Sequence, residues 1–320
     1  MSAKGPPQGT RGDSTADGPP PGTRPPGEAA RSDARRGSAS RAIPLPADLQ
    51  ATVARALAED IGDGDLTAQL VPVDAKATAT VITREPVVLC GAPYFDVAMH
   101  HVDPATRIVW HVDEGDLVPA NTRLCTITGA ARSLLTTERV GLNLLQTLSA
   151  TATATRRHVD LVAGTRAKVI ETRKTIPGLR LAQKYAVRVG GGTNNRIGLF
   201  DGILIKENHI IAAGGITQAL QAARAQAKPG TTIQIEVETL AQLEEAIAAG
   251  ATLILLDNFD IAKMTEAVRI CAGRAELEAS GGINLTTIRK VAETGVDRIS
   301  IGTLTKDIEA ADLSMRFQAG

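Results

Sequence analysis

Charged or polar groups stand at the ends of five of six short apolar segments in the second half of this 320-residue chain, and a glycine ends the sixth. These end groups are Glu171, Arg173 and Lys174 after VI; Lys206 and Glu207 after ILI; Glu236 and Glu238 in IQIEVE; Asp257 after LILL; Ser280, Gly281 and Gly282 after LEA; and Gly302 after RISI. A single charge of this kind is usually a solvated rim residue. Repetition at most of the segment ends, with both signs of charge, instead favours one shared site.

A dense group of cations indicates what such a site binds. The stretch between 173 and 196 also contains the glycines Gly190, Gly191 and Gly192, and its cations are Arg173, Lys174, Arg180, Lys184, Arg188 and Arg196. Guanidinium groups match carboxylates and phosphates in two-point contacts, so this stretch predicts an anion site, the alternative being a solvated basic helix with a flexible loop. The glycine turns in SGGI and SIGT add backbone N–H groups that suit phosphates, although each turn alone is weak evidence.

The segments that carry these groups read as strands that alternate with amphipathic helices. The predicted strands are 167–171, 202–206, 233–238, 252–257, 276–280 and 298–302. Between them, stretches such as TLAQLEEAIAAG repeat apolar residues at helical spacing and end in glycine. Six βα units in series predict an α/β fold with a parallel sheet that closes toward a barrel, whose active site lies at the carboxyl ends of the strands.

The first half of the chain has a different pattern of predicted helices and strands. Residues 46–130 combine helical stretches at 49–60 and 92–100 with short β-branched segments, which predicts an α+β domain. Residues 131–163 have helical spacing, and the small residues 149–155 predict either a kink or close approach of another element.

Residues 1–40 contain seven glycines, seven prolines, six basic and four acidic residues, and no large apolar side chain after Met1. This composition predicts a disordered tail over 1–44. A transit peptide is the alternative, but the acidic residues and the lack of an apolar face count against it.

Composition and motifs exclude several classes of protein. The 35 basic and 35 acidic residues balance, which argues against a nucleic-acid-coating protein, and no apolar run is long enough to cross a membrane or to form a secretory signal. The three cysteines are widely spaced, so we expect no disulfide framework and a cytoplasmic location. The chain lacks a phosphate-binding P-loop and a dinucleotide fingerprint, and its five histidines have no metal-ligand spacing.

Long stretches resemble one family of transferases. ERVGLNLLQTLSATATATRRHV, ETRKTIPGLRLAQKYAVRVGGGTNNRIGLFDGILIKENHI, IEVETLAQLEEAIAAGA, LLDNF, SGGI and GVDRISIGTLT together resemble the quinolinate phosphoribosyltransferases, over roughly residues 45–318. TRKTxPGLR and IKENHI are specific to this family and its near relatives.

The resemblance implies a fold, a reaction and an assembly. An α/β sandwich domain at 45–150, to which the segment 305–320 returns, would precede an incomplete (β/α) barrel at 151–304. The family joins quinolinate to 5-phosphoribosyl-1-pyrophosphate with Mg²⁺, and it releases nicotinate mononucleotide, pyrophosphate and carbon dioxide in de novo NAD synthesis. A homodimer with shared active sites, or a higher oligomer, is expected, with no nucleic acid and no membrane as partner.

The resemblance also assigns roles to individual residues. Lys174, Lys206, Glu236 and Asp257 are the expected catalytic residues, and Glu236 and Asp257 would hold the metal directly or through water. The expected substrate-binding residues are Arg139, Thr172, Arg173, Lys174, Asn195, Arg196, Lys206, Glu236, Asp257, Ser280, Gly281, Gly282, Gly302, Thr303, Leu304 and Lys306, with Arg139 reaching the neighbouring subunit's barrel. Asn195 is a departure, because the family often has histidine there, and an amide can donate a hydrogen bond but carries no charge.

Three other functions compete with this interpretation. A barrel lyase could form a Schiff base on Lys206, although the dense arginines and paired acids argue against it. A non-catalytic relative is suggested only by Asn195, and a transferase could act on nicotinate or another ring acid.

Overall fold

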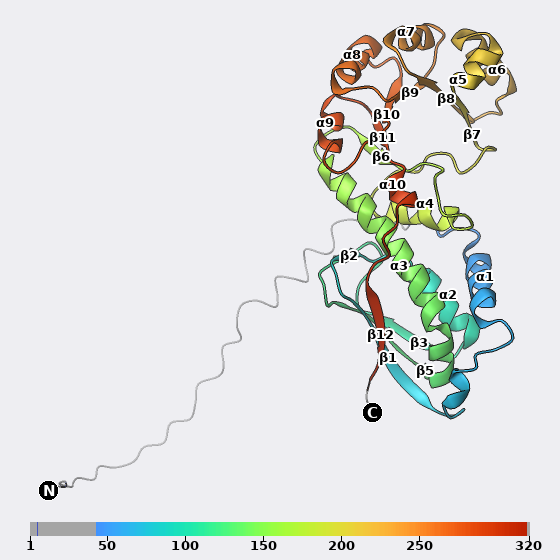
Figure 1. The fold of residues 1–320 in the computed structure, drawn as a ribbon, viewed down its shortest axis with the longest axis vertical. Helices are drawn as coiled ribbons and strands as arrows, with labels where there is room; N and C mark the ends of the chain where they lie inside the picture. Colours follow the sequence, from blue (N-terminus) through green and yellow to red (C-terminus); the bar gives the residue numbers. More distant parts are fainter. Residues whose placement is uncertain (1–4, 6–42, 319–320) are drawn as a thin grey trace, which may run out of the picture. The chain divides into compact units, whose positions relative to one another are not determined.

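Residue 5 and residues 43–318 are described by a computed structural model (Figure 1). The tail predicted over 1–44 therefore lies outside the described residues, apart from positions 5, 43 and 44. The helices and strands before the barrel are α1 (Leu49–Ile61), β1 (Lys76–Thr83), β2 (Val87–Val88), α2 (Ala92–Val102), β3 (Arg107–Trp110), β4 (Leu117–Val118), β5 (Arg123–Ala130) and α3 (Ala131–Leu161), with a 3₁₀ turn at Ala68–Leu70.

The first half of the chain forms a four-stranded antiparallel sheet in the order β12-β1-β5-β3. Its strand β12 (Leu313–Phe317) comes from the end of the chain and pairs with β1 so that Met315 lies opposite Val81. Alternate residues of β1 and β5, among them Val81 and Ile127, are buried in one core with α2 and α3. A second core lies between α1, α2, α3 and α4 (Arg180–Val189).

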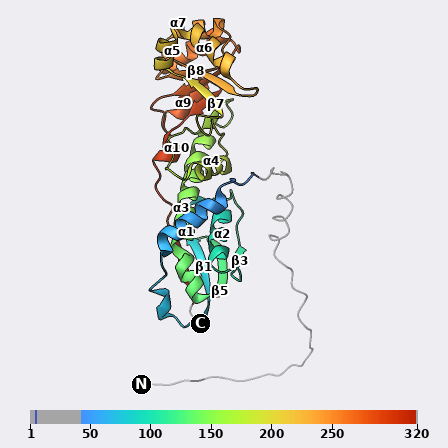
Figure 2. The same cartoon turned by 90° about the vertical axis from the view of Figure 1, so that its right-hand side faces the viewer.

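Helix α3 connects this sheet to the barrel, as Figures 1 and 2 show, and it is unbroken over its 31 residues. The expected kink is therefore wrong, and the alternative, close approach of another element, is confirmed. Backbone N–H groups of Val88 and Cys90 donate to the hydroxyls of Thr153 (2.9 Å) and Ser149 (3.0 Å), so β2 lies directly against the helix. Residue 150 is the predicted end of the first domain. Because α3 is continuous, this residue lies inside a helix rather than in a linker between domains.

The second half is an incomplete barrel, which confirms the predicted fold class. The remaining elements are β6 (Lys168–Ile170), β7 (Gly202–Ile205), α5 (Glu207–Ala213), α6 (Ile216–Gln226), β8 (Thr232–Val237), α7 (Leu240–Ala248), β9 (Leu253–Asp257), α8 (Ile261–Cys271), β10 (Glu276–Ser280), α9 (Ile288–Glu293), β11 (Arg298–Ser300) and α10 (Thr303–Lys306). The six strands are parallel in the order β6-β11-β10-β9-β8-β7, so the barrel is open between β6 and β7.

Strand periodicity gives the barrel an apolar outside and a partly polar inside. Ile235, Ile254 and Leu256 belong to the core beneath the helices. On the opposite face, Gln234 donates to the buried Glu278 at 3.0 Å, and Arg298 Nε lies 3.1 Å from the same carboxylate. Burial raises the pKa of Glu278 despite this arginine, because desolvation penalises its charged form. Across the described part of the chain, no helix has the length and apolar character needed to span a bilayer.

Candidate active site

The barrel strands bring several of the predicted groups to one end. Glu236 lies in β8, Asp257 ends β9, Ser280 ends β10, and Lys206 directly follows β7. In the sheet register Ser280 is opposite Asp257, whereas Glu236 is opposite Leu255, two residues before Asp257. Parallel strands with alternating faces therefore place the two carboxylates on the same side of neighbouring strands.

Lys206 and Glu236 form the central ion pair of this end. The lysine Nζ lies 3.2 Å from Glu236 Oε2, and the side chains are 53% and 14% exposed, respectively. Asp257 accepts a hydrogen bond of 2.9 Å from the Asn258 amide. A Cβ on Gly281, which has φ +106°, would lie 2.1 Å from the Asn258 side-chain oxygen, so this turn requires glycine.

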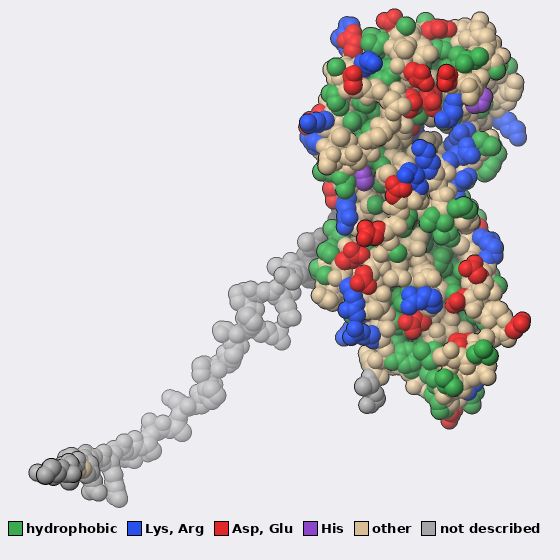
Figure 3. Space-filling model, in the orientation of Figure 1, with side chains coloured by type: hydrophobic (Ala, Val, Ile, Leu, Met, Phe, Trp, Pro, Cys, Tyr) green, Lys and Arg blue, Asp and Glu red, His purple; other side chains and the backbone are tan. Residues whose placement is uncertain are grey.

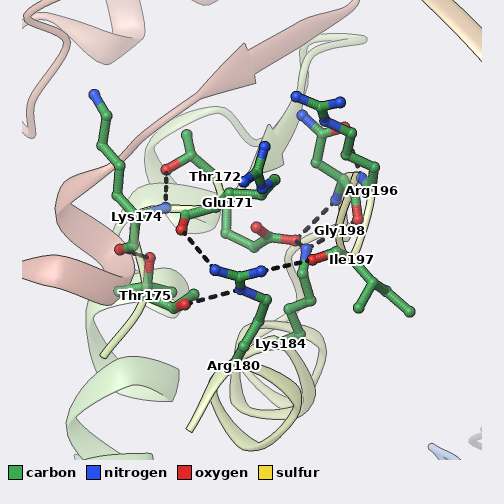
Figure 4. A network of polar contacts seen from close by, with 12 residues as sticks. Glu171, Thr172, Lys174, Thr175, Arg180, Lys184, Arg196, Ile197 and Gly198 are labelled. Atoms are coloured by element: carbon green, nitrogen blue, oxygen red, sulfur yellow. Dashed lines mark hydrogen bonds and ion pairs between the residues drawn. The ribbon is translucent and has the colours of Figure 1, made fainter. Parts of the chain in front are cut away.

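The segment that follows β6 supplies the next group of cations. Lys174 is fixed through its backbone, because its N–H donates to the Thr172 hydroxyl at 3.2 Å and its carbonyl accepts from the Thr305 hydroxyl at 2.9 Å. Its side chain runs beside Gly302, where an added Cβ would lie 3.1 Å from Lys174 Cδ. In Figure 4, Lys174 and Arg196 extend away from α4 on either side of Thr172.

The open edge of β6 positions Asn195 and Arg196. Thr193 forms a parallel bridge with Ile170, and its N–H donates to the Val169 carbonyl at 2.8 Å, so the chain continues along this edge. The Asn195 side-chain oxygen accepts from the Arg196 N–H at 2.8 Å, and the Arg196 guanidinium donates to the Gly202 carbonyl at 2.9 Å. Desolvation, and then the nearby charge of Arg173, lower the pKa of Arg196, so the two arginines lie close enough to repel.

Two cations that the sequence assigned to the anion site have other contacts. Arg180 forms its hydrogen bonds with neighbouring loop residues. Its guanidinium donates to the Thr175 hydroxyl (3.1 Å) and to the carbonyls of Ile197 (3.2 Å) and Arg173 (3.5 Å). Lys184 is 2% exposed and forms an ion pair with Glu171, which is fully buried. Neither side chain is therefore placed as a surface anion ligand, and Figure 4 shows both rising from α4 beneath Thr172 and Lys174.

The glycine run at 190–192 is fixed by packing rather than being a flexible loop. A Cβ on Gly190 would lie 2.4 Å from the Ala152 carbonyl of α3, and one on Gly192 would lie 2.8 Å from Thr155. Gly191 has φ +91°. These glycines let the 190–196 segment pass against α3 and reach the edge of β6.

The expected phosphate end lies at the carboxyl ends of β10 and β11. Gly281 and Gly282 follow β10 and both have positive φ, whereas Gly302 precedes the four-residue helix α10. Thr303 is exposed and Leu304 is fully buried, so Leu304 offers only its backbone to a ligand. Lys306 Nζ contacts Asp307 at 2.5 Å.

Arg139 stands apart from this group within one chain. It is exposed on α3, 13 residues before Ala152, where the 190–196 segment meets the same helix. At about 1.5 Å per residue, this separation along the helix is about 20 Å. Figure 3 shows basic side chains gathered around a hollow below the barrel, with acidic ones beside them on the barrel.

Two cavities lie near these residues. One of 260 Å³ lies at the open side of the barrel, beside the first residues of β7 and β8, and Asn195 and Arg196 are among its lining residues. A second, of 420 Å³, lies between α1, α3 and residues 177–179. The second cavity includes Val140, next to Arg139, but none of the predicted barrel residues.

Family models match most of the described chain. The model described as the quinolinate phosphoribosyl transferase N-terminal domain matches residues 65–149, and the model of its C-terminal domain matches residues 151–316. The chain belongs to the quinolinate phosphoribosyltransferase family.

Relatives within this family are similar over most of their length. The carboxylating nicotinate-nucleotide pyrophosphorylase of Mycobacterium leprae is 43% identical over 82% of this chain and 95% of its own. The chloroplastic enzyme of Oryza sativa subsp. japonica is 39% identical over 84% of this chain and 78% of its own. The nicotinate-nucleotide pyrophosphorylase structure from Francisella tularensis has a TM-score of 0.83 and 46% identity, covering 86% of this chain and 98% of that one.

A more distant structure shares the fold alone. Human nicotinic acid phosphoribosyltransferase has a TM-score of 0.55 with 15% identity, covering 84% of this chain and 74% of that one. This likeness does not decide between quinolinate and nicotinate as substrate, whereas the family models match the quinolinate enzymes.

Proposed function

We propose that this protein transfers the phosphoribosyl group of 5-phosphoribosyl-1-pyrophosphate to quinolinate and releases nicotinate mononucleotide, pyrophosphate and carbon dioxide. The observation that carries the proposal is the placement of Lys206, Glu236, Asp257 and Ser280 at the carboxyl ends of neighbouring barrel strands, with the Lys174 side chain beside Gly302 at the end of β11. Membership of the quinolinate phosphoribosyltransferase family supports it.

The cations match the charges of the two substrates. Quinolinate has two carboxylates, and the ribose donor has a phosphate and a pyrophosphate. At an effective dielectric constant of 20, one pair of charges 4 Å apart is worth about 4 kcal/mol before desolvation. Several lysines and arginines therefore offset the repulsion between two polyanions that must meet in one site.

Glu236 and Asp257 suit the reacting end of the ribose. Displacement at the anomeric carbon passes through a state with oxocarbenium character, and carboxylates stabilise its positive charge. Lys206, paired with Glu236, would move to a substrate carboxylate when both substrates bind. Carbon dioxide then leaves without an organic cofactor, because the positive charge of the N-ribosylated ring stabilises the carbanion.

The donor set also suits Mg²⁺. Carboxylate oxygens are its preferred protein ligands, and the ion keeps most of its waters while it binds one or two carboxylates and substrate phosphates. No cluster of three or more potential metal ligands occurs among the described side chains, so Glu236 and Asp257 would hold the ion together with water and substrate. When bound, Mg²⁺ would neutralise charge on the leaving pyrophosphate.

We further propose that the active site is shared in a homodimer. Within one chain, Arg139 is exposed on α3, away from the carboxyl ends of the barrel strands, and its chain neighbour Val140 lines the cavity between α1 and α3. A two-fold partner would bring this arginine to the neighbouring barrel, where it adds a cation for quinolinate. The three buried cysteines agree with a reducing compartment, and we expect the cytoplasm.

The Schiff-base alternative fits the geometry less well. A lysine that attacks a carbonyl needs to lose its proton, which burial in an apolar pocket promotes. Lys206 is half exposed and forms an ion pair with Glu236, so it does not lie in an apolar pocket.

Product analysis tests the proposed reaction. Purified protein is supplied with 5-phosphoribosyl-1-pyrophosphate, Mg²⁺ and either quinolinate or nicotinate. We expect nicotinate mononucleotide and one carbon dioxide per turnover with quinolinate, with little product from nicotinate. Turnover of nicotinate without quinolinate turnover would instead support the ring-acid alternative.

A further inference from the structure

The buried ion pair between Glu171 and Lys184 links the two segments that carry the substrate-binding arginines. Glu171 directly follows β6 and directly precedes Thr172, Arg173 and Lys174. Lys184 rises from the middle of α4, and the two side chains are 0% and 2% exposed. Glu171 and Lys184 therefore lie below the site, where neither can touch a substrate from the surface.

Both charges also hold the backbone of Asn195. The Asn195 N–H donates to Glu171 Oε1 at 2.8 Å, and the Asn195 carbonyl accepts from Lys184 Nζ at 2.9 Å. Asn195 immediately precedes Arg196, so the same pair fixes the segment after β6 and the segment along its open edge. Together with the Thr193 bridge and the contacts of Arg180, this pair ties Arg196 to the segment of Arg173.

Such an anchor has a physical reason. Desolvation, and then the positive charge of Arg173, lower the pKa of Arg196, so holding these two like charges near each other has a cost that the surrounding structure must offset. Burial raises the pKa of Glu171 and lowers that of Lys184, while their mutual attraction opposes both shifts. A buried ion pair is often no more stabilising than apolar residues of similar size. Its stability contribution therefore does not explain why these charges occur here.

We propose that Glu171 and Lys184 are positioning residues that hold Arg196 and Asn195 at the distance from Arg173 at which all three bind quinolinate. This inference rests on the proposed function, because it assigns these residues to the quinolinate side of that site. Its energetic effect appears in quinolinate binding more than in binding of the ribose donor.

The decisive variant replaces both charges by apolar residues, Glu171→Leu with Lys184→Met. No unpaired charge is left in the core, so the melting temperature stays near that of the wild type. The Asn195 backbone loses both of its charged partners, so we expect the KM for quinolinate to rise about 10- to 100-fold. A displacement of a binding group by about 1 Å can have an effect of this size. The KM for the ribose donor changes much less.

A matched control lies on the same helix. Tyr185 is 5% exposed, and its hydroxyl donates to Glu114 at 3.0 Å. Unlike Lys184, the Tyr185 side chain packs toward α1, α2 and α3 rather than toward the 195–196 segment. Tyr185→Phe removes a buried hydrogen bond to a carboxylate and is expected to leave both KM values unchanged. Should the double variant fail to fold, Lys184→Met measured at a temperature where it is folded serves in its place.

Coupling to Arg196 separates positioning from general stability. If the pair acts through Arg196, then Arg196→Ala raises the KM for quinolinate much less in the E171L/K184M double variant than in the wild type. An unchanged quinolinate KM in a double variant that melts like the wild type would overturn the proposal, and so would equal effects of Arg196→Ala in both backgrounds. Failure of the wild type to turn over quinolinate would instead refute the proposed function.

Discussion

Lys206 Nζ lies 3.2 Å from Glu236 Oε2, so groups at the carboxyl ends of two neighbouring barrel strands compensate each other's charge. This pair stands at the mouth of the barrel, with the lysine more exposed than the glutamate. A substrate carboxylate that attracts Lys206 would leave Glu236 available for the positive charge that develops on the ribose. Binding of the acid and stabilisation of the transition state are thereby linked through one contact.

Lys206→Ala tests this link. We expect turnover to fall about 100- to 1,000-fold, because a charge aimed at the reacting groups is lost, while the melting temperature stays unchanged. Steady-state kinetics and thermal denaturation measure both effects. Reduction with borohydride should trap no substrate on the protein, and a covalent adduct on Lys206 would favour the lyase.

Asn195 is expected to act through its amide N–H₂, because its amide oxygen already accepts from the Arg196 N–H. Asn195→His keeps a donor and should retain activity, whereas Asn195→Leu should raise the KM for quinolinate about 10-fold. The measurement is the KM for each substrate in both variants. An unchanged quinolinate KM for the leucine variant would remove this side chain from the site.

Gly302→Ala tests the position of Lys174. Gly302 has φ −71° and ψ −26°, which alanine adopts without strain, so the backbone should tolerate the change. The new methyl group would lie 3.1 Å from Lys174 Cδ and displace that side chain. We expect a loss of turnover of about 10-fold with an unchanged melting temperature, and wild-type turnover would show that Lys174 needs no fixed position.

Asp201 holds the turn that follows Arg196. Desolvation acts to raise its pKa, but hydrogen bonds from the N–H groups of Ile197 and Gly198, each 2.8 Å, lower it below the usual value of an aspartate. A lowered folded-state pKa stabilises the protein above the unfolded-state pKa, and this stabilisation is lost as the pH falls through the folded-state pKa. Asp201→Asn should therefore lower the melting temperature at pH 7, with a difference that shrinks below about pH 4. An equal difference at pH 3 and pH 7 would exclude the charge as its cause.

The sequence predicted the barrel and its strand ends well, because both depend on local periodicity. All six predicted strands occur, with boundaries shifted by no more than two residues at either end. Asp257 and Ser280 end their strands as predicted. They lie opposite each other in the sheet, because the carboxyl ends of parallel strands lie at the same end of a barrel.

The sequence could not assign partners to the cations. Lys184 and Arg188 have the same side-chain chemistry as surface anion ligands, yet the structure buries Lys184 against Glu171. Lys184 also lies four residues from both Arg180 and Arg188, which is helical spacing, but which face of α4 is covered depends on packing against distant segments. The contact of the glycines at 190–192 with α3 also depends on packing between distant segments, so the sequence around these glycines did not predict it.

Complementation between inactive variants tests the shared site. Arg139 lies on α3 about 20 Å along the helix from the point where the 190–196 segment packs, which is farther than its side chain extends. Arg139→Ala and Lys206→Ala should each be nearly inactive alone. In a hybrid dimer, the barrel with Lys206 receives Arg139 from its partner, so one of the two sites is complete.

The expected size of the effect follows from symmetry. Random reassortment of equal amounts makes about half of the dimers hybrid, so about a quarter of wild-type activity should return. Subunit exchange is verified with differently tagged chains. The control mixes Lys206→Ala with Glu236→Ala, because these residues form an ion pair within one barrel and each barrel of a hybrid then keeps one defect. Activity should return only in the mixture that contains Arg139→Ala, and its absence there after verified exchange would show that Arg139 serves its own chain.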